Sequence, residues 1–293
     1  MRFFPSIYFF FLILVGSILA QSSFSYITSF YSPQLARIWT YKVYFPAGYY
    51  EKSDYQFPVV YLLHGSDGDE NDWDFAYLIL DSLIDNRLIP PTFAISPVTG
   101  TSWWVNTPID NYESAFIYDL IPEINKKYRT INDRDGRGIA GYSMGGYGAL
   151  RYALVYSELF AAAIILSPSI YDGLPPLESS ARSSGAFGTP FDEKNWINKN
   201  YPTSLRSYFE KKILVPIFIA TGDDDYHHDE DLKFNIEQQA VLLYGKLHKL
   251  SGNPAELRIV NGGHNIEVWE RTFCEGIQYI FKYMSAPQVL SNK

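Results

Sequence analysis

A serine lies between two glycines in the segment Gly141-Tyr-Ser143-Met-Gly145. Residues 136–140 before it predict a short strand, and residues 147–156 after it predict a helix. A serine on so sharp a strand-to-helix turn exposes its hydroxyl at the helix N-terminus, and flanking glycines prevent side-chain collisions. A hydroxyl is a weak nucleophile unless a base activates it. The motif therefore predicts acyl transfer by Ser143, with a histidine and an acid supplied from elsewhere in the chain.

His264 is the predicted base. It lies in Asn261-Gly-Gly-His-Asn265, between a predicted strand (256–260) and the last predicted helix (266–284). In α/β-hydrolases the chain order is nucleophile, acid, histidine, and His264 alone fits a separate loop after the acid. The other histidines fit less well: His64 precedes the serine, His248 lies on a helix among lysines, and His227 and His228 are too near the candidate acid.

Three aspartates, Asp223, Asp224 and Asp225, follow the predicted strand 213–220. The acid must be buried enough to orient His264, and spacing alone does not separate the three. The others are then expected to be solvated or to cap a helix that starts near Asp231. A second interpretation treats the run 223–231 as an acidic loop or a cation site, although it lacks the glycine and spacing of a calcium loop.

The segment His64-Gly65-Ser66 follows a nearly continuous apolar strand at 57–63. In this kind of fold, backbone N–H groups after that strand and after the nucleophile form the oxyanion hole. The N–H groups of Ser66 and Met144 are the predicted donors, each contributing about 3 kcal/mol to transition-state stabilisation. The alternative is that Gly65 only permits a sharp turn.

Three tryptophans, Trp73, Trp103 and Trp104, lie in loops or helix starts that follow predicted strands. Active sites of open α/β sheets lie at this edge, and sugars or phenolic acids stack on aromatic rings. They are therefore candidate substrate-binding residues. With 24 tyrosines and 20 phenylalanines in the chain, packing in the core is the alternative role for each of them.

Strand-like and helix-like segments alternate along the chain, which predicts a mostly parallel central sheet flanked by helices. Further strands are expected at 36–45, 92–98 and 160–166, and a helix that Pro122 kinks is expected at 111–128. Residues 171–201 show little periodicity. We interpret them as an insertion over the active site, with a solvated surface loop as the alternative.

The 293 residues are 47% hydrophobic, enough for one domain at 21–293. Arg2 and the apolar stretch from Ile7 to Ala20 predict a signal peptide at 1–20 and secretion, with an uncleaved anchor as the alternative. A net charge of -8 argues against nucleic acid or an anionic membrane as partner. No stable membrane association is expected after cleavage. Cys274 is the one cysteine, so no internal disulfide is expected.

Three segments together resemble the esterase D-like family of α/β-hydrolases. They are Pro58 to Trp73 with His64-Gly65, Gly138 to Gly146 around Ser143, and Gly262-Gly-His264 with Val268-Trp269. The resemblance extends from about Ala36 to Phe281. The family includes feruloyl and acetyl-xylan esterases, S-formylglutathione hydrolases and mycolyltransferases. In the feruloyl-esterase branch the acid follows a glycine and two further residues, which from Gly222 indicates Asp225.

Together with the predicted signal peptide, the resemblance implies a secreted serine esterase of the α/β-hydrolase fold that acts through an acyl-enzyme, without a metal or organic cofactor. Its expected substrates are small-molecule or polysaccharide esters, with feruloyl, acetyl or other short acyl groups. S-formylglutathione hydrolases fit less well because they lack a secretion signal and differ around the first motif. Two alternatives stay open: an acyltransferase with the same triad, and a non-catalytic protein for carbohydrate binding or adhesion.

Overall fold

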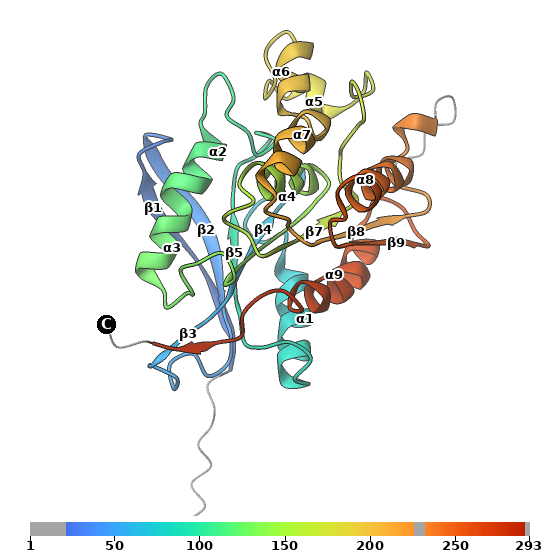
Figure 1. Cartoon of the computed structure of the whole chain (residues 1–293). Coiled ribbons are helices and arrows are strands. Elements are labelled where there is room, and N and C mark those ends of the chain that lie inside the picture. The colour runs from blue at the N-terminus through green and yellow to red at the C-terminus, as the bar shows by residue number, and fades with distance from the viewer. Residues whose placement is uncertain (1–21, 226–231, 291–293) are drawn as a thin grey trace, which may run out of the picture.

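A computed structural model describes residues 22–225 and 232–290. Its centre is an eight-stranded sheet in the order β1-β2-β5-β4-β6-β7-β8-β9 (Figure 1). From β5 to β9 the neighbouring strands are parallel, and β1 and β2 form an antiparallel extension at one side. The strands are β1 (Phe24–Ser32), β2 (Arg37–Phe45), β4 (Val59–Leu63), β5 (Phe93–Pro97), β6 (Arg137–Tyr142), β7 (Ala162–Leu166), β8 (Ile217–Gly222) and β9 (Ala255–Val260).

Alternate residues of the central strands enter two separate cores. In β4, Val59, Tyr61 and Leu63 belong to one core, and Val60 and Leu62 to the other. Every residue of β4, β6, β7 and β8 is buried, because helices cover both faces of the parallel part of the sheet. The predicted mostly parallel sheet between helices is confirmed.

The helices divide between the two faces (Figure 1). On one face lie α1 (Asp74–Asp85) and α9 (Ile266–Ile280). The other face is covered by α4 (Met144–Val155), by α8 (Ile236–Ser251) and by the segment from α2 to α3. This arrangement leaves the carboxyl ends of the parallel strands to the loops that follow them.

The helix expected at 111–128 is divided by a π-helical turn. It consists of α2 (Tyr112–Ala115), the π-helical turn η1 (Phe116–Leu120) and α3 (Ile121–Lys127), with Pro122 in the first turn of α3. Proline has no N–H to donate, so a regular helix would lose a hydrogen bond there. A wider turn before Pro122 accommodates this loss, which is the physical form of the predicted kink.

Residues 171–201 are an insertion with short helices. They contain α5 (Ser180–Ser183) and α6 (Glu193–Lys199), and α7 (Tyr201–Lys211) follows directly. Aromatic contacts attach the segment to the rest of the domain: Trp196 packs on Trp103 with 5.9 Å between ring centroids and on Tyr147 with 5.7 Å. The insertion is therefore an ordered layer beside the ends of the strands, at the top of Figure 1.

Several parts had no counterpart in the sequence prediction: β1, α1, α7 and the small sheet of β3 (Tyr55–Gln56) with β10 (Gln288–Val289). Within 22–225 and 232–290, no helix is both long and apolar enough to cross a membrane. The predicted signal peptide at 1–20, His227, His228 and the predicted helix start at Asp231 lie outside the described residues. In the structure that helix, α8, begins at Ile236, after the short 3-10 turn η2 (Leu232–Phe234).

Candidate active site

Ser143 lies on a tight turn between β6 and α4. Its backbone has φ +56° and ψ -122°, a strained conformation for a residue with a side chain. The two flanking glycines permit this turn. A Cβ on Gly141 would lie 2.0 Å from the carbonyl oxygen of Gly145, and one on Gly145 would lie 2.0 Å from that of Leu63. The sequence suggested that glycine is required at both positions, and the reason is that a side chain at either one would collide with a backbone carbonyl.

Ser143, His264 and Asp225 form a continuous hydrogen-bonded row. The Ser143 hydroxyl oxygen is 2.9 Å from Nε2 of His264, and Nδ1 of His264 is 2.6 Å from Oδ1 of Asp225. These residues follow β6, β9 and β8, so three separate strand ends supply them. Because a carboxylate accepts, Nδ1 carries the proton and Nε2 is left to accept from the serine hydroxyl.

Asp225 alone among the three adjacent aspartates is buried, with 0% exposure. Burial by itself would raise the pKa of Asp225, but hydrogen bonds from His264, Ser167 and Thr221 and the charge of His264 lower it. Thr221 donates to Oδ2 at 2.9 Å. The net result is a pKa below the ordinary value, so the carboxylate stays ionised beside the imidazole.

Asp223 and Asp224 are exposed and form hydrogen bonds with the loop that carries His264. The Gly262 N–H donates to Oδ1 of Asp223 at 2.9 Å, and the Asp224 N–H donates to the Gly262 carbonyl at 3.0 Å. A Cβ on Gly222 would lie 2.0 Å from the same carbonyl. The loop after β8 is therefore bound closely to the loop that carries His264.

The loop that carries Ser66 lies next to the turn that carries Ser143. A Cβ on Gly65 would be 3.4 Å from the Ser143 Cβ, and Gly145 packs against the carbonyls of Leu63 and His64. Met144 begins α4, so its N–H has no intrahelical acceptor. Within the described part of the chain, neither the Ser66 N–H nor the Met144 N–H donates to a backbone carbonyl of a turn or loop. Both N–H groups therefore stay candidate donors to a ligand oxygen.

A cavity of about 230 Å³ opens at the Ser143 hydroxyl. The Ser169 hydroxyl lies 3.4 Å from that of Ser143, and Tyr171 forms part of the wall. The remaining wall comes from Ser66 and from the insertion, with Pro176, Glu178, Ser179 and Ser180. Part of the insertion therefore lies over the serine, as the sequence predicted. Ser169 carried no motif by which sequence reasoning could have found it.

The three tryptophans proposed as substrate-binding residues lie in the core instead. Trp73 and Trp104 are 0% exposed and Trp103 is 1% exposed, so no ring face is open to a substrate. The Trp104 indole donates to the His64 carbonyl at 3.2 Å, and Trp73 packs on Tyr142. The prediction for these residues is corrected: long-range packing turned the rings inward, where they support the loops around Ser143.

His64 is a neutral structural histidine. It is 1% exposed, accepts the Thr99 N–H on Nε2 at 3.0 Å and contacts the Gly65 carbonyl through Nδ1 at 2.6 Å. Burial lowers the pKa of His64. Through these two hydrogen bonds the ring connects the loop of Ser66 with the loop that begins at Thr99.

Ser167 and Trp269 contact Asp225 and His264, and neither was assigned a role from the sequence. The Trp269 indole donates to the Ser167 hydroxyl at 2.9 Å, and Ser167 in turn hydrogen-bonds to Asp225. The Trp269 ring also meets His264 edge-on at 5.2 Å and stacks on Tyr142 at 4.1 Å. Trp269 was part of a recognised motif, whereas Ser167 was marked only by its place at the end of a strand.

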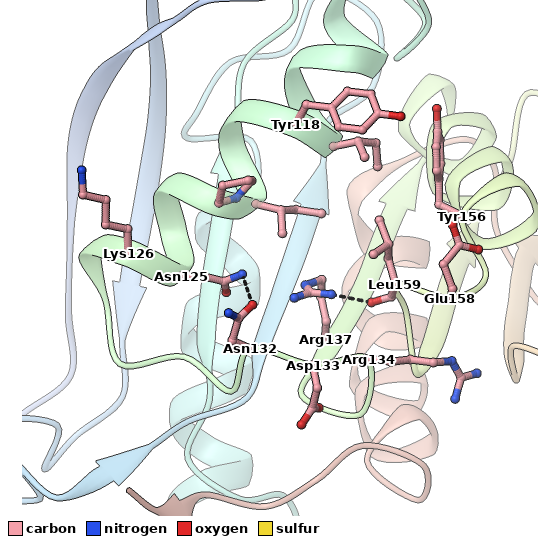
Figure 2. A pocket seen from close by; sticks show the side chains of 13 residues that line it. Tyr118, Asn125, Lys126, Asn132, Asp133, Arg134, Arg137, Tyr156, Glu158 and Leu159 are labelled. Carbon is pink, nitrogen blue, oxygen red and sulfur yellow. Dashed lines mark hydrogen bonds between the residues drawn. The ribbon is translucent and has the colours of Figure 1, made fainter. Parts of the chain in front are cut away.

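A larger cavity, of about 790 Å³, lies away from this chemistry (Figure 2). Arg137, the first residue of β6, lines it, whereas Ser143 follows the last residue of that strand. In Figure 2 the Arg137 guanidinium donates to the Leu159 carbonyl at 2.8 Å, and Asn125 donates to Asn132 at 2.6 Å. The cavity is therefore at the amino-terminal edge of the sheet, opposite the candidate active site.

Comparisons with known proteins relate this chain to esterases. The model of a family described as Putative esterase matches residues 32–280. An esterase of Mycobacterium tuberculosis is 36% identical over 120 residues, 39% of this chain. An endo-1,4-beta-xylanase/feruloyl esterase of Xylanibacter ruminicola is 31% identical over 154 residues, 49% of this chain. These matches cover 26% and 21% of the two relatives' own lengths.

A solved structure of a ferulic acid esterase superposes with a TM-score of 0.72 and 25% sequence identity. The superposition covers 90% of this chain and all (100%) of that one. The α/β-hydrolase fold and the esterase D-like resemblance predicted from the sequence are thereby confirmed.

Proposed function

Since this chain belongs to the Putative esterase family, we propose that it is a serine carboxylic-ester hydrolase that cleaves esters through an acyl-enzyme on Ser143. The observation that carries the proposal is the row from Ser143 through His264 to buried Asp225, with contacts of 2.9 and 2.6 Å. A base within hydrogen-bond reach of the nucleophile, itself oriented by a third group, is the arrangement that activates a hydroxyl.

In the first step His264 takes the hydroxyl proton on Nε2 as the Ser143 oxygen attacks the ester carbonyl carbon. The carbonyl oxygen becomes an oxyanion, which the N–H groups of Ser66 and Met144 stabilise. His264 then returns the proton to the leaving alcohol, and the acyl group stays on Ser143. Water repeats the sequence on the acyl-enzyme and releases the acid.

Asp225 holds the imidazole in the productive tautomer and stabilises its positive charge during both steps. Ser167 and Thr221 keep the carboxylate ionised and aimed at Nδ1 by hydrogen-bonding to it. Trp269 connects this support to the ring of His264. Besides the ester and water, the proposed reaction uses only side chains and backbone groups of this chain.

The proposed substrate is a carbohydrate-linked feruloyl or acetyl ester, or another short acyl ester. The cavity at Ser143 is about 230 Å³, below the range of about 300–1,000 Å³ that encloses a drug-sized ligand. Such a space suits an acetyl or single-ring acyl group, with the alcohol part lying outside it. The feruloyl esterase activities named for a relative and a superposed structure support the same choice.

We further propose that residues 1–20 are removed on export and that 21–293 form the mature domain. The support is Arg2 followed by the apolar stretch from Ile7 to Ala20. N-terminal sequencing of protein recovered from the culture medium tests this; a retained residue 1 would contradict it.

The experiment that tests the reaction compares the protein with its Ser143→Ala variant. The panel is p-nitrophenyl acetate, butyrate and octanoate, methyl ferulate and acetylated xylan. We expect kcat to fall about 10⁶-fold in the variant with little change in the thermal midpoint. Activity that survives in Ser143→Ala would overturn the proposal. Transfer of the acyl group to an added alcohol in preference to water would instead identify an acyltransferase.

A further inference from the structure

A second cavity, of about 510 Å³, lies beside the cavity at Ser143. Two segments form it: the loop from Thr99 to Tyr112 and residues 184–189 of the insertion. Helix α5 links the two cavities, because Ser180 at its start lines the first and Ser184 just after its end lines the second.

The second cavity is also connected to the proposed oxyanion loop. The Thr99 N–H donates to Nε2 of His64, and His64 is two residues before Ser66. On the other side, the Ser66 and Ser180 hydroxyl oxygens are 3.3 Å apart. A molecule bound in the second cavity would therefore lie a short helix away from an ester carbonyl at Ser143.

The lining is rich in hydroxyl groups and holds no lysine or arginine. A hydroxyl both donates and accepts, which matches the hydroxyls of a sugar ring. The polar and aromatic groups of the lining are Thr99, Thr101, Ser102, Thr107, Asp110, Tyr112, Ser184 and Thr189.

Hydrogen bonds hold the rim of the cavity in place. The Thr107 hydroxyl accepts the N–H groups of Ile109 and Asp110 at 3.2 and 2.9 Å. Arg37 forms an ion pair with Asp110 at 2.7 Å and donates to the Tyr112 hydroxyl at 2.8 Å. Ile109 stays 89% exposed at this rim. A rim ordered in advance loses little freedom when a ligand binds.

We propose that the second cavity is the subsite for the sugar part of the ester, a neutral pentose or hexose unit next to the acylated hydroxyl. This inference rests on the proposed function, because it makes the sugar the alcohol that leaves Ser143. The hydroxyl-rich lining, which holds no lysine or arginine, favours a neutral polyol over an anion.

Binding of unesterified sugar to the Ser143→Ala protein tests this subsite. The probe is an arabinose-substituted xylo-oligosaccharide that carries no acyl group, titrated while amide signals are followed by NMR. We expect saturable binding with Kd on the order of 1 mM, with shifts at Thr101 and Ser184. No saturable shift, or shifts confined to other surfaces, would overturn the inference.

Two substitutions at half-buried Thr101 sharpen the test. Thr101→Tyr fills the cavity and should weaken binding more than tenfold, and Thr101→Val removes one hydroxyl and should weaken it at least threefold. Thr28→Val on the edge strand β1 is the matched control and should bind as before. Equal affinity in all three would overturn the inference. Because no ester is involved, failure here is distinct from a loss of Ser143-dependent hydrolysis, which would overturn the proposed function.

Discussion

Asp225 differs from the two aspartates before it by its burial and by the side chains that bind it. Replacement by asparagine keeps the shape but presents an amide to Nδ1, which disfavours the productive tautomer of His264. We expect Asp225→Asn to lower kcat about 10⁴-fold on p-nitrophenyl acetate. Asp223→Asn is the matched control, because an amide oxygen can still accept the Gly262 N–H. Similar losses in both variants would contradict the assignment of Asp225.

His64 gives the stability of the domain a pH dependence of predictable sign. Burial lowers its pKa in the folded state, whereas the unfolded chain has the ordinary value of about 6.5. Below that value the unfolded state binds the proton that the folded state excludes, so protonation favours unfolding. Stability is therefore complete above pH 6.5 and falls as the pH drops towards the folded pKa.

We expect the free energy of unfolding to fall between pH 6.5 and 5 by up to about 1.4 kcal/mol per pH unit from this group. Denaturant titrations across this range measure the slope. His64→Gln should flatten it at some cost in stability, and His248→Gln on α8 should leave it unchanged. A slope that persists in His64→Gln would assign the effect to other groups.

At the residue scale, residue type and chain order were enough to select Ser143 and His264 as candidates. Spacing left the three aspartates equivalent; the family resemblance indicated Asp225, and Asp225 is the one of the three that is buried. The tryptophans were placed wrongly because loop position says nothing of side-chain direction. Ser169 approaches Ser143 from 26 residues away along the chain, and no local pattern marks such a contact.

The turn between β6 and α4 depends on glycines at the level of the backbone. In Gly145→Ala the new Cβ would meet the Leu63 carbonyl oxygen at 2.0 Å, so the strand or the helix must shift. We expect a loss of more than about 3 kcal/mol in unfolding free energy and little remaining activity. Thermal and denaturant unfolding measure the first effect.

Gly245→Ala is the matched control for that substitution. Gly245 lies inside α8, where nothing is within 4 Å of a new Cβ. Alanine is the better helix former, so this variant should gain about 0.5–1 kcal/mol. Comparable destabilisation of both variants would show that the contact at Gly145 is not the cause.

Helices and strands could be predicted from the sequence where the local pattern of apolar residues matches the burial that they have in the fold. The central strands β4 and β7 are short apolar runs because both of their faces are covered. The edge strand β1 was missed: most of its residues are partly or fully exposed, so it has no continuous apolar run. The insertion was recognised by its lack of periodicity, but its attachment through Trp196 depends on distant rings.

The whole molecule has the architecture that alternating strands and helices predict, because each parallel crossover needs a helix to cover the sheet. What the pattern did not contain is the shape of the space above Ser143. That space is set by the insertion and by the loop 99–112, two segments without a strong sequence pattern that meet only in the folded domain. The substrate is therefore the part of the function for which the sequence alone was least informative.

Charge at the scale of the whole molecule discriminates between substrates. The net charge is -8, and acidic residues gather around the site: Asp67, Asp69 and Glu70 after Ser66, Glu178 in the cavity wall, and exposed Asp223 and Asp224 beside Asp225. Such a field slows the approach of an anion and leaves a neutral ester unaffected, and salt screens it. A glutathione thioester is anionic at pH 7, whereas an acetylated or feruloylated sugar is neutral.

We therefore expect kcat/KM for S-formylglutathione to be low and to rise about two- to fivefold as the ionic strength increases from 0.01 to 0.2 M. The value for p-nitrophenyl acetate, a neutral ester of a small acyl group, should change little over the same range and serves as the control. A rate on the glutathione thioester that falls with added salt would reveal a cationic binding surface. The acidic residues around the site would then not control access to Ser143. The charge argument for a neutral carbohydrate ester as the substrate would be wrong.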